Sequence, residues 1–161
     1  MDYLWSPWRY QYVTAARPQS ACIFCEYAAS NNDQENLVVY RGRLNFILLN
    51  RFPYTSGHVM IAPYEHVDTL ERASKETAEE LILLTRECER HLRAIYRPSG
   101  LNLGMNLGES AGAGIAGHIH MHVLPRWSGD TSFITTVSET RVLPEDLAET
   151  WRKLKQEFGA R

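Results

Sequence analysis

Short runs of apolar residues, bounded by glycine, proline and polar residues, recur along the chain and are typical of β-strands. Residues 37–49 hold two runs rich in Val, Ile, Leu and Phe that are interrupted at Gly42, which predicts two strands joined by a tight turn. Further strands are predicted over residues 57–63, 101–107, 118–124 and, as a short edge strand, 133–137.

The apolar spacing lengthens to three or four residues between residues 74 and 97, which predicts a long helix. Ser74 is the expected N-cap, and Pro98 enforces the end of the helix. A second helix is predicted near the C-terminus, with Pro144 in its first turn. The buried stripes of the two helices are expected to hold Leu81, Leu84, Cys88, Leu92 and Ile95 in the first, and Leu147, Trp151, Leu154 and Phe158 in the second.

Few of the strands are separated by the helical crossover that parallel strands need, so the order of elements predicts an α+β fold dominated by antiparallel pairing. We expect a sheet of about five strands with one long helix and a C-terminal helix. At 161 residues, of which 44% are hydrophobic, the chain is predicted to form one domain over residues 1–161. Residues 1–20 form an aromatic N-terminal arm in this scheme, and residues 141–161 a C-terminal helical extension.

The charge and the cysteines narrow the expected partners and the compartment. A formal net charge of -2 and a pI near 6.3 give no general attraction to nucleic acid. No apolar run is long enough to cross a membrane, and no secretory leader is recognised, so neither membrane insertion nor secretion is expected. Three cysteines are an odd number and suit a reducing compartment, for which the cytoplasm is the simplest prediction.

Residues 118–126 carry the pattern that is most informative about chemistry. On a strand, His118, His120 and His122 project from one face and the apolar residues between them from the other. Burying all three in a dry core would cost about 1–3 kcal/mol for each unpaired nitrogen, so we expect them to line a site. Two chemistries fit. Three imidazoles can hold a catalytic zinc ion, or one can attack phosphorus while its neighbours bind phosphate oxygens and protonate the leaving group.

Three segments together resemble one family. His-x-His-x-His followed by two apolar residues and Pro125-Arg126 is similar to the signature of the histidine triad superfamily of nucleotide hydrolases and transferases. Residues 50–59 resemble the nucleoside-binding turn of this superfamily, and residues 22–25 resemble its opening motif. The resemblance implies a histidine-triad-like fold, a purine nucleotide substrate and a homodimer, for which the aromatic arm is a candidate contact.

The histidines differ in their expected roles. His120, in the middle of the row, is the predicted nucleophile, and the resemblance implies the same role. An imidazole with an ordinary pKa of about 6.5 is mostly neutral at cytoplasmic pH and can attack phosphorus without a separate base. His122 is expected to contact the non-bridging or leaving oxygen.

The expected substrate-binding residues lie on two turns. The resemblance implies that Asn50 binds the ribose hydroxyls and that Asn106 contacts phosphate. The alternative is that either is an ordinary turn or strand-end residue. Gly112, Ala113 and Gly114 are expected to leave backbone N–H groups free to approach phosphate.

The turn before the histidines departs from the family pattern. Many members place a glutamine four residues before the first histidine, where it contacts the bridging and leaving phosphates, but this chain has Gly114 there. This turn, residues 125–130 and residues 4–9 resemble the bacterial diadenosine polyphosphate phosphorylase branch, in which inorganic phosphate replaces water. The resemblance implies a phosphorylase, in preference to a hydrolase, that cleaves a dinucleoside polyphosphate such as diadenosine tetraphosphate through a covalent nucleotidyl-histidine.

A structural zinc site is the expected cofactor site, and no organic cofactor is expected. The resemblance implies four ligands, which are Cys22, Cys25, His66 and His118. Two reduced surface cysteines are the alternative. His58 is expected to be structural, and His91 to be a solvated helix residue.

Two rival functions stay open at this point. The histidine row can belong to a metal-dependent phosphoester hydrolase, whose chemistry a chelator would stop. A catalytically inactive nucleotide-binding module would keep Asn50 but would give no reason to retain His120.

Overall fold

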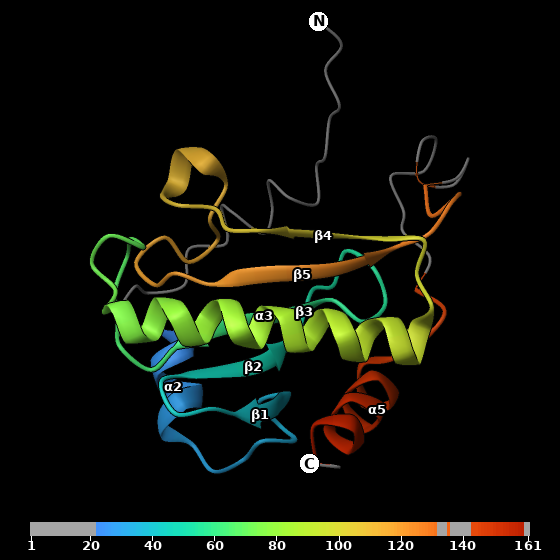
Figure 1. The fold of residues 1–161 in the computed structure, drawn as a ribbon, viewed down its shortest axis with the longest axis horizontal. Coiled ribbons are helices and arrows are strands. Elements are labelled where there is room, and N and C mark those ends of the chain that lie inside the picture. The colour runs from blue at the N-terminus through green and yellow to red at the C-terminus, as the bar shows by residue number, and fades with distance from the viewer. Residues whose placement is uncertain (1–21, 132–134, 136–142, 160–161) are drawn as a thin grey trace, which may run out of the picture.

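A computed structural model describes residues 22–131, 135 and 143–159 of the chain (Figure 1). The predicted aromatic arm over residues 1–20, and all but one residue of the predicted edge strand over 133–137, lie outside these described residues.

Five strands form one antiparallel sheet, as the sequence predicted. The order across the sheet is β1-β2-β3-β5-β4, and every neighbouring pair is antiparallel. The tight turn between the first two strands is closed by a hydrogen bond from the N–H of Gly42 to the carbonyl of Asn45. The strands are β1 (Val38–Arg41), β2 (Asn45–Leu49), β3 (Val59–Pro63), β4 (Gly100–Gly104) and β5 (Met121–Arg126).

Alternation along the strands gives the sheet two different faces. One, which we call the helix face, packs against two helices, α3 (Lys75–Tyr96) and α5 (Leu147–Gly159). The other, which we call the histidine face, packs against one short helix, α2 (Ile23–Ala29). The helix face presents Ile47, Leu49, Val59, Ile61 and Val123, and the histidine face presents Phe46, Leu48, Met60, Ala62 and His122.

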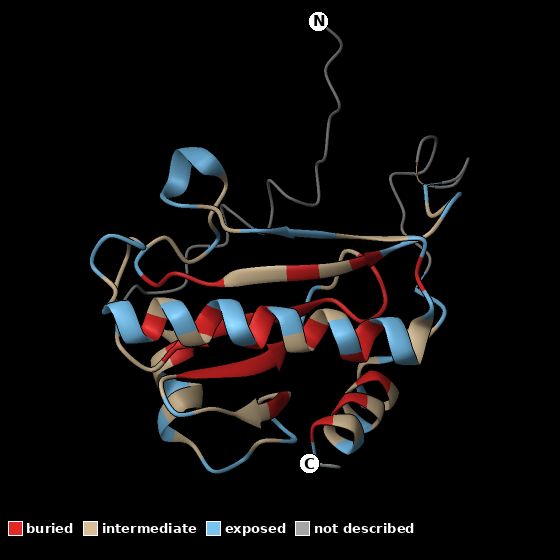
Figure 2. Ribbon diagram, viewed as in Figure 1, coloured by how far each residue is buried: buried red, intermediate tan, exposed pale blue. Residues whose placement is uncertain are grey.

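The long helix α3 follows its prediction closely. The side chain of Ser74 accepts a hydrogen bond from the N–H of Thr77, and Arg97 ends the helix in a left-handed conformation with φ 45°, directly before Pro98. The buried residues of α3 lie toward the sheet, whereas β4 at the sheet's edge is the most exposed strand (Figure 2). Fully burying a leucine stabilises a fold by about 1.5–3 kcal/mol, so this stripe contributes much of the stability.

The C-terminal helix begins later than predicted. Pro144 is not in its first turn, because α5 starts at Leu147. The carboxylate of Asp146 accepts a hydrogen bond from the N–H of Glu149 at 2.8 Å and therefore caps the helix. The indole Nε1–H of Trp151 donates to the carbonyl of Val38 at 3.0 Å, which ties α5 to the outer strand.

Two predicted strands have different limits in the structure. The strand expected over residues 118–124 starts only at Met121, because the N–H of Ile119 donates to the carbonyl of Val67 outside the sheet's ladder. The strand expected over residues 101–107 ends at Gly104, which pairs with His122 near the start of β5, so its later residues have no strand beside them. The helix α2 was not predicted at all.

Candidate active site and metal cluster

The three histidines of the row occupy the start of β5 and the extended segment before it. His118 and His120 are buried, and His122 is half-buried. The ring centroids of His120 and His122 are 4.8 Å apart, and the ring of Phe24 packs against both His118 and His120. The structure thus brings together the two residues predicted to be catalytic.

Hydrogen bonding fixes which nitrogen of His120 is free. Its Nδ1 lies 2.9 Å from the carbonyl oxygen of His118. A carbonyl only accepts, so Nδ1 carries the proton and Nε2 keeps a lone pair. A nucleophilic imidazole needs one ring nitrogen with a free lone pair. In His120 this nitrogen is Nε2, while the hydrogen bond at Nδ1 holds the ring in place.

A fourth histidine orients His122, which the sequence did not reveal. The backbone N–H of Tyr54 donates to Nδ1 of His58 at 3.2 Å, so the proton of His58 is on Nε2. That Nε2 donates to Nδ1 of His122 at 2.9 Å, which leaves His122 with its own proton on Nε2. His58 was expected to be structural because the sequence around it shows only a preceding glycine at the start of a strand. Its contact with His122 depends on the pairing of β3 with β5, which the sequence does not show.

Burial keeps these imidazoles neutral. Desolvation and the neighbouring His122 and His120 lower the pKa of His58 from 6.5 to about 3. Desolvation, followed by the charge of His120, lowers the pKa of His122 to about 4. Burial also lowers the pKa of His120. At neutral pH the site therefore offers one lone pair on His120 and one N–H donor on His122.

Asn50 lies at the start of the turn that carries His58. Its Oδ1 accepts a hydrogen bond from the N–H of Phe52 at 2.9 Å, and its Nδ2 lies 3.4 Å from Nδ1 of His58. One lone pair and one amide hydrogen remain for a ligand. The turn closes at Gly57, with φ 78°, where a Cβ would lie 2.9 Å from the ring of Tyr96, so no larger residue fits.

The glycine-rich loop between β4 and β5 differs from its prediction. The N–H of Gly112 donates to the carbonyl of Glu109 at 2.8 Å, and the N–H of Ala113 donates to the carbonyl of Gly108 at 3.3 Å. These two amides are used within the loop and can reach a phosphate only if it rearranges. Asn106 is half-buried just after β4, and Gly114 is exposed.

The four predicted metal ligands come together in one cluster. The ligand atoms of Cys22, Cys25, His66 and His118 all lie within 4.8 Å of one another, and among the described residues this is the one such group. Cys22 Sγ lies 3.3 Å from Nδ1 of His118. Cys25 Sγ lies 3.3 Å from Nδ1 of His66.

The cluster fits a tetrahedral zinc ion. Ligand atoms around such an ion are about 3.3–3.8 Å apart, and four pairs of ligand atoms in the cluster are 3.2–3.7 Å apart. Two thiolates with two imidazoles form a normal closed ligand set. Nε2 of His118 lies 2.9 Å from the carbonyl of Pro63 and donates to it, so Nδ1 is the nitrogen left for a metal. His118 thus belongs with the cysteines, which counts against a metal held jointly by the histidine row.

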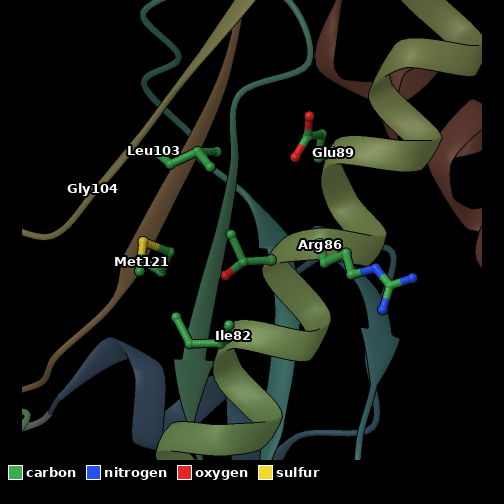
Figure 3. Close-up of a pocket in the computed structure, with 7 residues that line it drawn as sticks. Ile82, Arg86, Glu89, Leu103, Gly104 and Met121 are labelled. Atoms are coloured by element: carbon green, nitrogen blue, oxygen red, sulfur yellow. The ribbon is translucent and has the colours of Figure 1, made fainter.

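Two features lie on the helix face, away from these histidines. His91 was predicted to be solvated, and this is wrong: it is 2% exposed, with its Nδ1 3.3 Å from a carboxylate oxygen of Glu157 on α5. A hollow of about 290 Å³ opens between α3 and the strands β4 and β5 (Figure 3). Met121, which lines the hollow, projects from the helix face, so the hollow is not the histidine site.

Comparison with known proteins assigns the chain to a family. The HIT domain model matches residues 31–129. The chain belongs to the histidine triad (HIT) family. The AP-4-A phosphorylase of Mycobacterium tuberculosis is 40% identical to it over 97% of this chain and 84% of that protein. The resemblance seen in the sequence is therefore confirmed.

Solved structures of HIT proteins share the fold. A Zn-bound histidine triad family protein from Mycobacterium smegmatis matches with a TM-score of 0.70 and 28% identity, over 86% of this chain and 94% of that chain. A hypothetical histidine triad nucleotide-binding protein from Sulfolobus tokodaii matches with a TM-score of 0.69 and 26% identity, over 86% of this chain and 92% of that chain. The predicted α+β fold with a five-stranded antiparallel sheet is confirmed.

Proposed function

We propose that this HIT protein cleaves a dinucleoside polyphosphate, such as diadenosine tetraphosphate, through a nucleotide bound covalently to His120. One observation supports the proposal most strongly. His120, whose Nε2 has a free lone pair, lies next to His122, whose Nε2 carries a proton. The similarity to a protein named AP-4-A phosphorylase supports the substrate class.

The residues divide the reaction into two displacements. His120 Nε2 attacks the α-phosphorus, a P–N bond forms, and the P–O bond to the departing polyphosphate breaks while the Nε2–H of His122 stabilises that oxygen. The carbonyl of His118 then stabilises the cationic ring through its bond to Nδ1–H. An acceptor oxygen next attacks phosphorus, the P–N bond breaks, and His120 returns to its neutral state.

We favour inorganic phosphate as the acceptor. Gly114 stands where many family members carry a glutamine, and it is exposed in the structure, so this position supplies no side-chain amide to the leaving phosphates. The loop around Gly112 offers the missing contacts if its N–H groups turn outward. Asn50, with one amide hydrogen and one lone pair to spare, is the proposed ribose ligand, and Asn106 the proposed phosphate ligand.

Turnover with and without phosphate tests the proposal. With diadenosine tetraphosphate and phosphate, we expect ADP and ATP as products. Without phosphate, we expect one equivalent of ATP per site and no further turnover. Steady release of AMP at a rate that does not depend on the phosphate concentration would show a simple hydrolase. Binding without any cleavage would show the inactive nucleotide-binding module.

We propose zinc as the metal of the cluster, held by Cys22, Cys25, His66 and His118. A zinc-bound neighbour and the ligand spacings support it. Purified protein should contain one zinc ion per chain, and Cys25→Ser should lower the metal content. If a chelator stops the chemistry at once while α2 and the rest of the fold stay ordered, the metal-dependent hydrolase is favoured instead.

We also propose that the protein is a homodimer, joined through its β4–α3 surface, which consists of Ile82, Leu83, Arg86, Glu89, Leu103 and Gly104. The strand β4 lies at the edge of the sheet, and such edges attract another strand unless they are covered. Ile82, Leu83 and Leu103 are 59%, 57% and 49% exposed beside it. Arg86 and Glu89 line the same hollow, so a two-fold axis can bring opposite charges together (Figure 3).

Light scattering of the purified protein tests the dimer. We expect twice the chain mass of 18.5 kDa, and a monomer for Leu103→Glu, because that change buries a carboxylate in the contact. An unchanged mass for Leu103→Glu would place the contact elsewhere.

The compartment is also a proposal. All three cysteines are free in the structure. Thiolates that bind a metal must stay reduced, so we place the protein in the cytoplasm. None of the helices in the described part of the chain is long and apolar enough to cross a membrane.

A further inference from the structure

Phe24 connects the metal cluster to the nucleophile. Its side chain is fully buried on the histidine face. Its ring centroid lies 4.9 Å from that of His120 and 5.2 Å from that of His118. The hydrogen bond to the His118 carbonyl holds one edge of the His120 ring, and the Phe24 ring restricts the swing that this single bond leaves open.

The helix α2, which carries Phe24, is fixed at both ends. Its seven residues are too few to hold a helix in water by themselves. At its start, Cys22 and Cys25 belong to the metal cluster. At its end, the guanidinium of Arg41 donates to the carbonyls of Tyr27, Ala28 and Ser30, which satisfies groups that the end of a helix leaves open.

We propose that Phe24 is a positioning residue for His120, and that α2 transmits the state of the metal cluster to the nucleophile. This inference rests on the proposed function of His120. When the cluster holds its metal, Phe24 and the His118 carbonyl together fix the orientation of His120 Nε2. When the metal is removed, the first turn of α2 loosens and the His120 ring is no longer held in one orientation. The core of the helix face stays packed in both states.

Phe46 provides a matched control. Like Phe24, it is fully buried in the cluster of apolar residues on the histidine face, but its ring stacks on Tyr64, at 5.4 Å, instead of on a histidine. Phe24→Leu and Phe46→Leu remove the same ring from the same cluster, so a purely structural role predicts the same result for both.

The test uses zinc-loaded protein and measures three quantities for each variant. These are the unfolding temperature, the dissociation constant for the nucleotide, and the single-turnover rate at which His120 is nucleotidylated. We expect similar falls in unfolding temperature. Phe24→Leu should slow nucleotidylation by at least about tenfold relative to wild type and keep the dissociation constant within about twofold. A wrongly oriented nucleophile slows the reaction without weakening nucleotide binding. Phe46→Leu should keep the rate within about twofold.

Equal rates in the two variants, or a wild-type rate in Phe24→Leu, would overturn the inference. If wild-type protein forms no nucleotidyl-His120, the proposed function fails instead. NMR of the His120 Nδ1–H proton then still decides the inference. The signal should shift or broaden in Phe24→Leu and persist in Phe46→Leu, and equal spectra would overturn it.

Removing zinc with a chelator tests the role of the cluster. The His120 Nδ1–H signal should broaden, whereas the methyl signals of Ile47 and Val123 on the helix face should stay in place, and both should recover when zinc is restored. The proposal that α2 transmits the state of the metal cluster to His120 would be contradicted by a His120 signal that does not change on zinc removal. Loss of the whole fold on zinc removal would also contradict it.

Discussion

Both faces of the sheet bury histidines, and His91 on one face and His58 on the other have different partners. On the helix face, His91 meets Glu157 and the ring of Phe158, in a contact that joins α3 to α5. On the histidine face, His58 donates to another imidazole, His122, which keeps its own proton on Nε2. Burial alone therefore does not separate the two histidines. The partner of the second ring nitrogen does, and it is the ground on which we propose a functional role for His58.

The same contrast extends to the packing. The helix face is covered by two amphipathic helices, whose apolar stripes pack on the sheet beside four buried polar residues, Thr77, Thr85, His91 and Thr150. The histidine face is covered by a seven-residue helix, which packs through Phe24, carries two cysteines of the candidate metal cluster and is held at its end by Arg41. The apolar stripes of two helices stabilise the first face, and the chemistry that we propose lies on the second, where the buried imidazoles have hydrogen-bond partners.

Removing the proposed nucleophile should have the largest effect. His120→Ala should lower turnover of diadenosine tetraphosphate by at least about a thousandfold, because His122, the neighbouring imidazole, offers an N–H and no free lone pair. Circular dichroism should show a folded protein. Turnover near the wild-type rate would end the proposal.

Equivalent cavities on the two faces should affect different properties. Leu81 on the helix face and Leu48 on the histidine face are each 1% exposed. Leu81→Ala and Leu48→Ala should each lower the free energy of unfolding by about 2–5 kcal/mol, as measured by urea titration. Only Leu48→Ala should also slow turnover, because Leu48 pairs with Met60, which pairs with His122. Slower turnover in both folded variants would contradict the division between the faces.

Two buried histidines provide the next comparison. His58→Asn keeps an acceptor for the Tyr54 N–H but cannot reach His122, so kcat should fall by about a hundredfold with KM little changed. His91→Asn should leave kcat within about twofold and lower only the unfolding temperature. Nitrogen-15 NMR of His122 checks the cause, because its proton should move between ring nitrogens only in His58→Asn. An unchanged tautomer in His58→Asn would exclude this role.

The last predicted effect is the pH dependence of stability. His58 and His122 have pKa values of about 3 and about 4 in the folded protein, against 6.5 ordinarily. Between pH 6.5 and pH 4 the unfolded chain binds more protons, so the free energy of unfolding falls as the pH falls, by up to about 1.4 kcal/mol per pH unit for each imidazole. Urea titrations at pH 7 and pH 5 should show this fall, and His58→Asn should reduce it. Equal stability at both pH values would mean that these rings are not buried neutral.

The sequence predicts most of the sheet and the long helix because both rest on local patterns. The strands β1 and β2 and the helix α3 carry clear periodicity and end signals, such as Gly42 and Ser74. The helix α2 was missed because seven residues give too little periodicity, and its position depends on Arg41 and the cysteines. Pro144 was misplaced because Asp146, a better cap, follows it.

The motif predicted which residues lie together: the structure brings the four candidate metal ligands into one cluster and places His120 beside His122. Their chemical roles remain predictions. The contact of His58 with His122 and the use of the Gly112 amide within its own loop depend on contacts that only the folded chain creates.

The central claim is that His120 carries the nucleotide during turnover. The most direct test is to mix the protein with diadenosine tetraphosphate without phosphate, quench in base, where phosphoramidates survive, and map the modified peptide by mass spectrometry. We predict one adenylyl group on His120 that disappears as ADP when phosphate is added. An unmodified protein that still releases ATP, or an adenylyl group on another residue, would contradict the account.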